Sequence, residues 1–128
     1  MSTLEVSNLN DGTTTVATTF VTNGSAKAWA NIQGSGTAAL RDSNNLSSLT
    51  DSGTGQYSLS LSSSMGSTNV SSVVTGDFPG GASATALHGT NDFNNTTSSS
   101  IRVNFVNGSL IGFTDVVQGS FALFGDLA

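Results

Sequence analysis

Hydrophobic and polar residues alternate along much of this chain with a period of two. Every second residue of Ala26–Gln33 is apolar, and so is every second residue of Gln56–Ser62, beginning with Tyr57. Gly-rich turns separate these runs. Successive side chains of a β-strand point to opposite faces of the sheet, so each run predicts a strand with one face toward a core. The pattern is typical of an antiparallel sheet.

The same reading along the whole chain predicts strands only. They are Thr3–Asn8, Thr15–Thr22, Ala26–Gln33, Thr37–Asp42, Gln56–Ser62, Asn69–Thr75, Ser83–Leu87, Ser100–Val106, Ser109–Thr114 and Gly119–Leu127. Asn107-Gly108 favours a type I′ hairpin, with an irregular loop as the alternative. No window keeps apolar residues at i, i+3, i+4 and i+7 without an intervening Gly or Ser/Thr cluster. We therefore expect no helix longer than about two turns.

Composition supports a single β-domain. The chain has 128 residues, which is the usual size of one domain. Only 9% of residues are charged, against about 25% in ordinary soluble proteins. Ser, Thr, Asn and Gly contribute 22, 17, 12 and 15 residues instead. Thr fits a pleated surface and Asn and Gly fit turns. We expect an all-β chain, a single antiparallel sandwich or jelly-roll-like domain over residues 1–128.

Charge and hydropathy exclude several functions. The fixed cations are Lys27, Arg41 and Arg102, far apart in sequence, in a chain of net charge −5. Nucleic-acid binding needs clustered Lys and Arg, so we expect no nucleic-acid partner. The chain has no Cys, which excludes disulfides. No apolar run is long enough for a membrane span and no signal-peptide pattern is present, so we expect a soluble chain without membrane insertion.

The residue inventory argues against catalysis. His88 is the only histidine, and no nucleophile elbow surrounds it. Asp42 and Asp51 are nine residues apart in turn-like segments, where Asp usually bonds nearby backbone N–H groups. We therefore expect no catalytic residues and no enzyme activity.

Metal and cofactor sites are also not expected. Asn8–Gly12 and Asn91–Asn94 superficially resemble calcium loops, but neither has the ligand spacing of one, and Glu5 is the only glutamate. Asx turns are the preferred interpretation of both segments. A structural cation at a subunit junction is the alternative.

One stretch of the chain resembles a known family. The stretch Lys27–Tyr57, with Ala26 before it, contains five motif segments: Ala26-Lys27-Ala28-Trp29, Gly34-Ser35-Gly36-Thr37, Arg41-Asp42-Ser43, Ser47-Ser48-Leu49-Thr50-Asp51 and Gly53-Thr54-Gly55-Gln56-Tyr57. These resemble a module of small virion-associated proteins of marine tailed phages, which are often labelled tail-fibre-like. Met1–Val6 and Phe121–Asp126 look like the N-terminal and closing strands of such proteins. Residues 63–100 carry no such likeness.

The resemblance implies a structural role on a phage particle. The leading expectation is a surface fibre or spike-type component of the virion exterior, made in the bacterial host cytoplasm. A capsid decoration (cement) protein is the alternative, and a non-viral adhesin or ice-binding module is a third class. Expected partners are further copies of the chain, as a homotrimer, and other virion proteins of the capsid or tail. A host surface glycan or receptor is left open as a partner.

We expect assembly to depend on the chain ends. Residues 1–12 would form an N-terminal assembly strand and residues 13–128 the sandwich body. The candidate interface residues are Leu4, Val6, Leu9, Trp29, Phe121, Leu123 and Phe124. We interpret Trp29 as a core or subunit-interface anchor beside the stem of Lys27, and an exposed glycan platform with Tyr57 nearby is the alternative. Host contact would fall to the loops His88–Ser99 and Gly76–Ala82.

Overall fold

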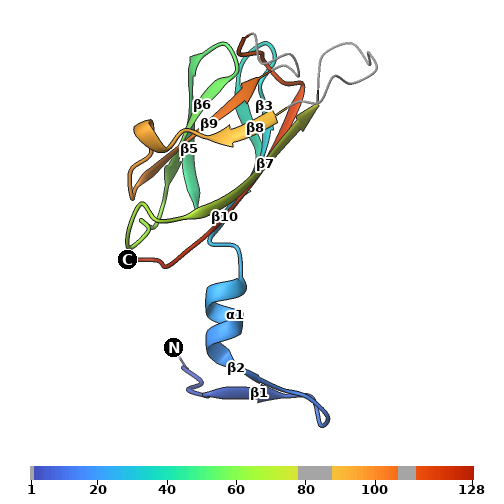
Figure 1. Cartoon of the computed structure of the whole chain (residues 1–128), viewed down its shortest axis with the longest axis vertical. Coiled ribbons are helices and arrows are strands. Elements are labelled where there is room, and N and C mark those ends of the chain that lie inside the picture. Colours follow the sequence, from blue (N-terminus) through green and yellow to red (C-terminus); the bar gives the residue numbers. More distant parts are fainter. Residues whose placement is uncertain (1, 78–87, 107–111) are drawn as a thin grey trace.

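The computed structural model describes residues 2–77, 88–106 and 112–128 (Figure 1). Within them lie ten strands, one short α-helix and one 3₁₀ turn. The elements are β1 Asn8–Asn10, β2 Thr15–Ala17, α1 Thr18–Gly24, β3 Ala28–Gln33, β4 Ala39–Asn44, β5 Leu46–Gly53, β6 Gln56–Leu61, β7 Ser71–Asp77, β8 His88–Asn91, η1 Phe93–Asn95, β9 Ser100–Val106 and β10 Gln118–Phe124.

Eight of these strands form a sandwich of two antiparallel sheets. One sheet has the order β4-β3-β10-β7 and the other β5-β6-β9-β8. The chain passes from the first sheet to the second between β4 and β5, at Asn45, which has a φ of 57°. β3 and β10, the first and last strands of the sandwich, pair with each other at the centre of their sheet. The expected all-β, antiparallel architecture is confirmed.

The core lies between the two sheets and follows the predicted alternation. In β3 the residues at 28, 30 and 32 are buried while their neighbours face outward. In β6 the alternate residues from Tyr57 onward are buried in the same way. The Tyr57 and Phe105 rings meet edge to face with centroids 5.9 Å apart, a favourable aromatic geometry. Phe121 and Leu123 of β10 complete the core from the opposite sheet.

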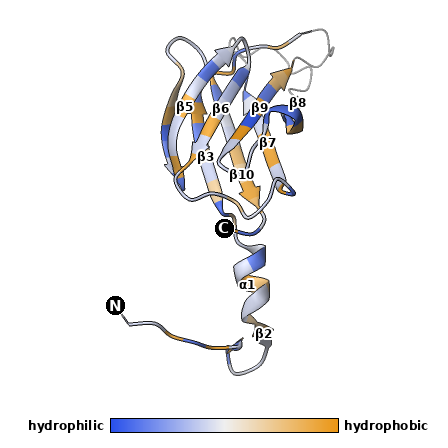
Figure 2. Cartoon of the chain, turned by 90° about the vertical axis from the view of Figure 1, so that its left-hand side faces the viewer, coloured by the Kyte–Doolittle hydropathy of each residue, from blue (hydrophilic) through white to orange (hydrophobic). Residues whose placement is uncertain are grey.

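Residues 2–24, here called the N-terminal arm, stand outside the sandwich (Figures 1 and 2). The prediction of a strand over Thr3–Asn8 is wrong, because the strand β1 begins only at Asn8 and pairs with β2. The turn between β1 and β2 determines where β1 lies in the sequence. The Asp11 carboxylate accepts backbone N–H groups of Thr13 and Thr14, and Gly12 has a φ of 97°, which glycine adopts without strain.

The prediction of a continuous strand over Thr15–Thr22 is also wrong. β2 ends at Ala17 and the chain continues as the helix α1, which has two turns. Ala17, just before the helix, and Phe20 and Val21 within it have helical spacing, but Gly24 stands at the next position of that pattern and obscures it. After the helix, Lys27 donates hydrogen bonds from Nζ to the carbonyl oxygens of Thr22 and Ser25. A lysine at this end satisfies free carbonyls of the last turn.

Two further segments differ from the sequence-based expectations. β5 was not expected, because register shifts between Leu46 and Ser48 and between Asp51 and Gly53 interrupt its alternation. His88–Ser99 is not a structureless loop, since β8 pairs with β9 and η1 follows. The expected strand Ser83–Leu87 and the Asn107-Gly108 turn lie outside the described residues, as do most of the loop at 76–82 and the start of the strand expected at 109–114.

Candidate functional site: the outer face of the β4-β3-β10-β7 sheet

The sole tryptophan of the chain lies on the outer face of the β4-β3-β10-β7 sheet. Trp29 is 39% exposed, because its neighbours in β3 are the residues that point inward. It is therefore not a core residue. Tyr57 is fully buried between the sheets, so it cannot extend an aromatic platform from Trp29. The Lys27 ammonium binds carbonyls at the end of the arm.

Strand register arranges the outward side chains in rows across three strands. Trp29 of β3 is opposite Ala122 of β10, which is opposite Val73 of β7. The next row contains Asn31, Ser120 and Thr75, and beyond it Gln118 is opposite Asp77. We call the outward side chains of these rows, with Gln33, the Trp29 face: one indole, the aliphatic side chains of Val73 (exposed) and Ala122 (half-buried), and otherwise hydroxyls, amides and a carboxylate.

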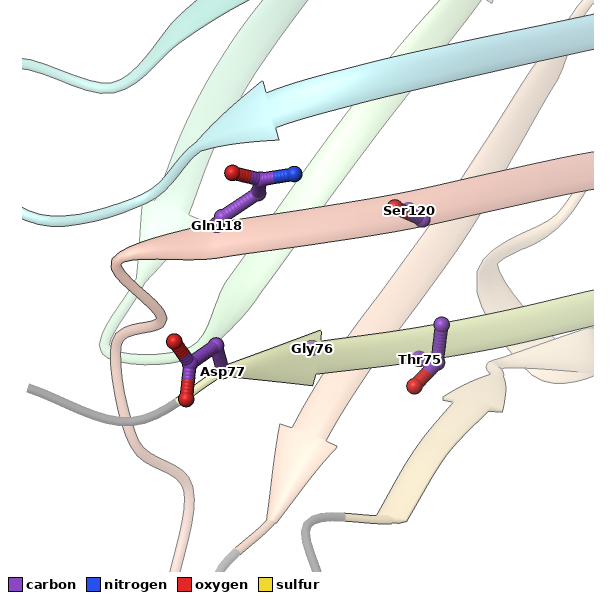
Figure 3. A pocket seen from close by; sticks show the side chains of 5 residues that line it. All are labelled: Thr75, Gly76, Asp77, Gln118 and Ser120. Atoms are coloured by element: carbon purple, nitrogen blue, oxygen red, sulfur yellow. The ribbon is translucent and has the colours of Figure 1, made fainter. Parts of the chain in front are cut away.

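A shallow hollow of about 300 Å³ lies on this face, over β7 and β10 (Figure 3). It is lined by Thr75, Gly76, Asp77, Gln118 and Ser120. The sequence analysis placed Gly76 and Asp77 in a host-contact loop, although both lie in β7, and it missed Thr75, Gln118 and Ser120. The signal was the run of polar residues at the outward positions of both strands, where alternation had been used only to find the core. The hollow offers donors and acceptors of hydrogen bonds and one negative charge.

Arg41 fixes the amide groups at one end of the Trp29 face. Its guanidinium donates to Oε1 of Gln118 (3.2 Å) and Oε1 of Gln33 (3.5 Å), and to the carbonyl oxygen of Val117 (3.2 Å). The NH₂ group of Gln33 donates to the carbonyl oxygen of Ser35 (3.4 Å), whereas Gln118 presents its NH₂ group to its surroundings as a donor. Asn31 has a buried Oδ1 without a hydrogen-bond partner, so the middle row contains an unused acceptor.

A second polar cluster ties the two sheets together. The buried phenol of Tyr57 donates to the carbonyl oxygen of Gly34 (3.0 Å) and lies 3.2 Å from Oδ1 of Asp115. Asp115 also accepts the backbone N–H of Gly55 at 2.7 Å. Burial, followed by the charge of Asp115, raises the pKa of Tyr57 well above its usual value. A neutral, fully buried phenol of this kind acts as a structural hydrogen-bond donor and is inaccessible as a catalyst.

A third cluster is centred on Asp92, at the start of η1. Its carboxylate accepts from Asn95 Nδ2 (2.8 Å), the Asn94 backbone N–H (3.2 Å) and Asn104 Nδ2 (3.4 Å). The Asn95 bond, then those of Asn104 and the Asn94 backbone, lower the pKa of Asp92. The segment Asn91–Asn94 is thus an Asx turn, as preferred from sequence.

The residues expected at an assembly interface divide between the arm and the sandwich. Leu4, Val6 and Leu9 are exposed on the arm, with 83%, 43% and 46% of their surfaces accessible. Phe121 and Leu123 are buried in the core of this same chain. Their role is to close the sandwich, while Phe124, the next outward position, is half-buried.

The structure shows how the remaining candidate groups are used. Asp42 lies in β4 and Asp51 in β5, so the two belong to different sheets. Each accepts a backbone N–H close in sequence, from Ser43 and Gly53 respectively. Across residues 2–77, 88–106 and 112–128, no three His, Asp or Glu side chains are grouped as a metal site would require. His88 lies in β8.

Comparisons with protein-family models, curated proteins and solved structures found no match. No helix in the described part of the chain is long and apolar enough to cross a membrane. The functional assignment therefore depends on the geometry of this chain and on the motifs of its sequence.

Proposed function

We propose that this protein is a non-enzymatic structural component of a tailed bacteriophage virion, held on the particle exterior by its N-terminal arm. The sandwich would then project as a fibre or spike-type module. The motifs of Lys27–Tyr57 support the phage assignment. The division of the chain into a closed sandwich and a separate arm supports the attachment role.

The observation that carries the proposal is the exposed apolar surface of the arm. None of its described residues is buried, yet its large hydrophobic side chains lie open to solvent: Leu4, Val6, Leu9, Val16, Phe20 and Val21. A helix of two turns is marginal in water without packing. Apolar side chains gathered on a protruding element are typical of a surface that a partner covers.

Further copies of this chain are the partners we favour, as a homotrimer in which the arms pack together against the particle. A capsid decoration protein is the second candidate. The same arm would then grip capsomers, and the sandwich would lie on the head instead of projecting from the tail.

Substitutions in the arm test the proposal. Replacing Leu4, Val6 and Leu9 together by Ser keeps the chain length but removes apolar surface, and we expect the variant to fold and to be missing from purified particles. Val73→Ser, a substitution of an exposed residue on the sandwich, is the matched control and should be incorporated normally. Incorporation of the triple variant at normal copy number would show that attachment occurs elsewhere. Locating the chain in a reconstruction of the intact particle separates the tail from the head.

A further inference from the structure

We propose that the Trp29 face is a binding site for neutral oligosaccharides, with one sugar ring stacked on Trp29 and the next seated in the hollow beside β7. The inference rests on the proposed function for its biological meaning, since it would supply the chemistry by which the particle contacts a host surface. The binding itself is a property of the sandwich alone.

Trp29 supplies the apolar half of such a site. Pyranose rings present a face of C–H groups, and an indole offers a flat apolar surface for them that also keeps a polar N–H. Trp29 is on an inner strand of its sheet, between β4 and β10, so the sheet backbone holds it in place. Rigid aromatic side chains of this kind provide contact area at a low cost in conformational entropy.

The hollow supplies the polar half. Sugar hydroxyls are both donors and acceptors, and the hollow offers the Asp77 carboxylate as an acceptor and the Thr75 and Ser120 hydroxyls as both. The Gln118 amide, with its oxygen bound by Arg41, is left with its NH₂ as a donor. Ser120 lies on β10 between its partners Asn31 and Thr75, so it is one strand across and two residues along from Trp29, the partner of Ala122. From strand spacing and rise, its Cα is about 8 Å from that of Trp29, so the hollow adjoins the indole on the same face.

The composition of the face favours a sugar over a protein partner. The cores of protein interfaces are apolar and depleted in charge, but here the large exposed hydrophobic side chains of the described rows are only Trp29 and Val73. The hydroxyl, amide and carboxylate groups between them would each need a matching partner in a dry interface. A carbohydrate satisfies them with its own hydroxyls and with bridging water.

Tryptophan fluorescence gives a direct test, because Trp29 is the only tryptophan. The full chain is titrated with maltose, cellobiose, lactose and mannobiose at millimolar concentrations, and at least one should shift or quench the emission and give a binding isotherm by calorimetry. Sialyllactose serves as the acidic comparison. If none of the four neutral sugars binds, or only sialyllactose does, the proposal is overturned. A change in emission that follows protein concentration and not sugar would instead identify the face as a contact between copies.

Variants separate the two halves of the site. Asp77→Ala keeps the fluorophore and should weaken binding several-fold. Trp29→Ala removes the fluorophore, so its affinity is measured by calorimetry, and it should be weaker by roughly tenfold or more. Ser58→Ala, in a strand of the opposite sheet, is the control and should bind normally. Unchanged affinity of both Asp77→Ala and Trp29→Ala, with the fold intact by circular dichroism, would overturn the assignment. These measurements use free protein, so their outcome is independent of whether the arm attaches the chain to a particle.

Discussion

Single side chains connect the two sheets of this sandwich, and Tyr57 is the clearest example. Its ring packs in the core against Phe105, while its hydroxyl reaches the other sheet at the Gly34 carbonyl. Gly34 leaves room for this contact, because a Cβ there would lie 2.3 Å from the Tyr57 hydroxyl oxygen. The sequence predicted that Tyr57 points inward. It could not predict the hydrogen bond, since Gly34 and Asp115 are distant along the chain.

Tyr57→Phe should lower the free energy of unfolding by about 1–2 kcal/mol, because it leaves buried acceptors without their donor. The ring and its contact with Phe105 stay, so the loss measures the hydroxyl alone. Urea denaturation of the wild type and the variant checks this expectation. Ser58→Ala, at the next position of the same strand, is the control; it removes only an exposed hydroxyl contact with Ser52 and should cost clearly less. Equal stability of Tyr57→Phe and wild type would show that the hydroxyl bonds contribute nothing.

The raised pKa of Tyr57 predicts a dependence of stability on pH. Above the ordinary tyrosine value of 10.0, the unfolded chain loses the phenolic proton while the folded chain keeps it. The folded state then binds more protons, so the free energy of unfolding falls as pH rises. Tyr57 is the only tyrosine, and its phenolate absorbance reports its titration directly. Denaturation curves above pH 10 should lose stability in wild type, and Tyr57→Phe should lack this part of the loss.

At the scale of elements, the sequence predicted those strands whose alternation is regular. β3 and β6 were found because each buries every second residue. β5 was missed because its bulges shift the period, and α1 because Gly24 and several threonines interrupt its helical spacing. Trp29 was singled out from the sequence, but the polar residues beside it were missed, since alternation identifies the inward residues, whereas the rows of outward ones depend on which strands become neighbours.

Between β8 and β9, the Asp92 side chain caps the start of η1 by accepting hydrogen bonds from Asn94 and Asn95. Asp92→Ala should destabilise the protein by about 1 kcal/mol, a typical cost of losing a capping side chain. Asn94→Ala, which leaves the backbone N–H in place, is the matched control and should cost less. Because the folded pKa of Asp92 is depressed, its contribution is present above the unfolded value of 3.8 and is lost as pH falls through the folded value. Acid denaturation should therefore be less steep in Asp92→Ala, and an unchanged acid transition would contradict this account.

At the scale of the whole molecule, every buried core residue in the described part of the chain lies in the sandwich and none lies in the arm. A chain starting at Ser25 should therefore keep its β-rich circular dichroism and unfold with a free energy within about 0.5 kcal/mol of the full chain, as for surface changes away from the core. Its association should differ. We expect the exposed apolar side chains of the arm to be buried against other copies of the chain. The full chain should therefore sediment as an oligomer and the shortened chain as a monomer.

Full-length Val73→Ser is the control for this comparison. It alters an exposed apolar side chain of the sandwich and should sediment with the wild type. If the shortened chain is still an oligomer, the subunit contact lies on the sandwich, and the Trp29 face becomes the first place to look for it. If the shortened chain fails to fold, the arm stabilises the sandwich within the same chain, and the separation of a closed body from an attachment segment is wrong.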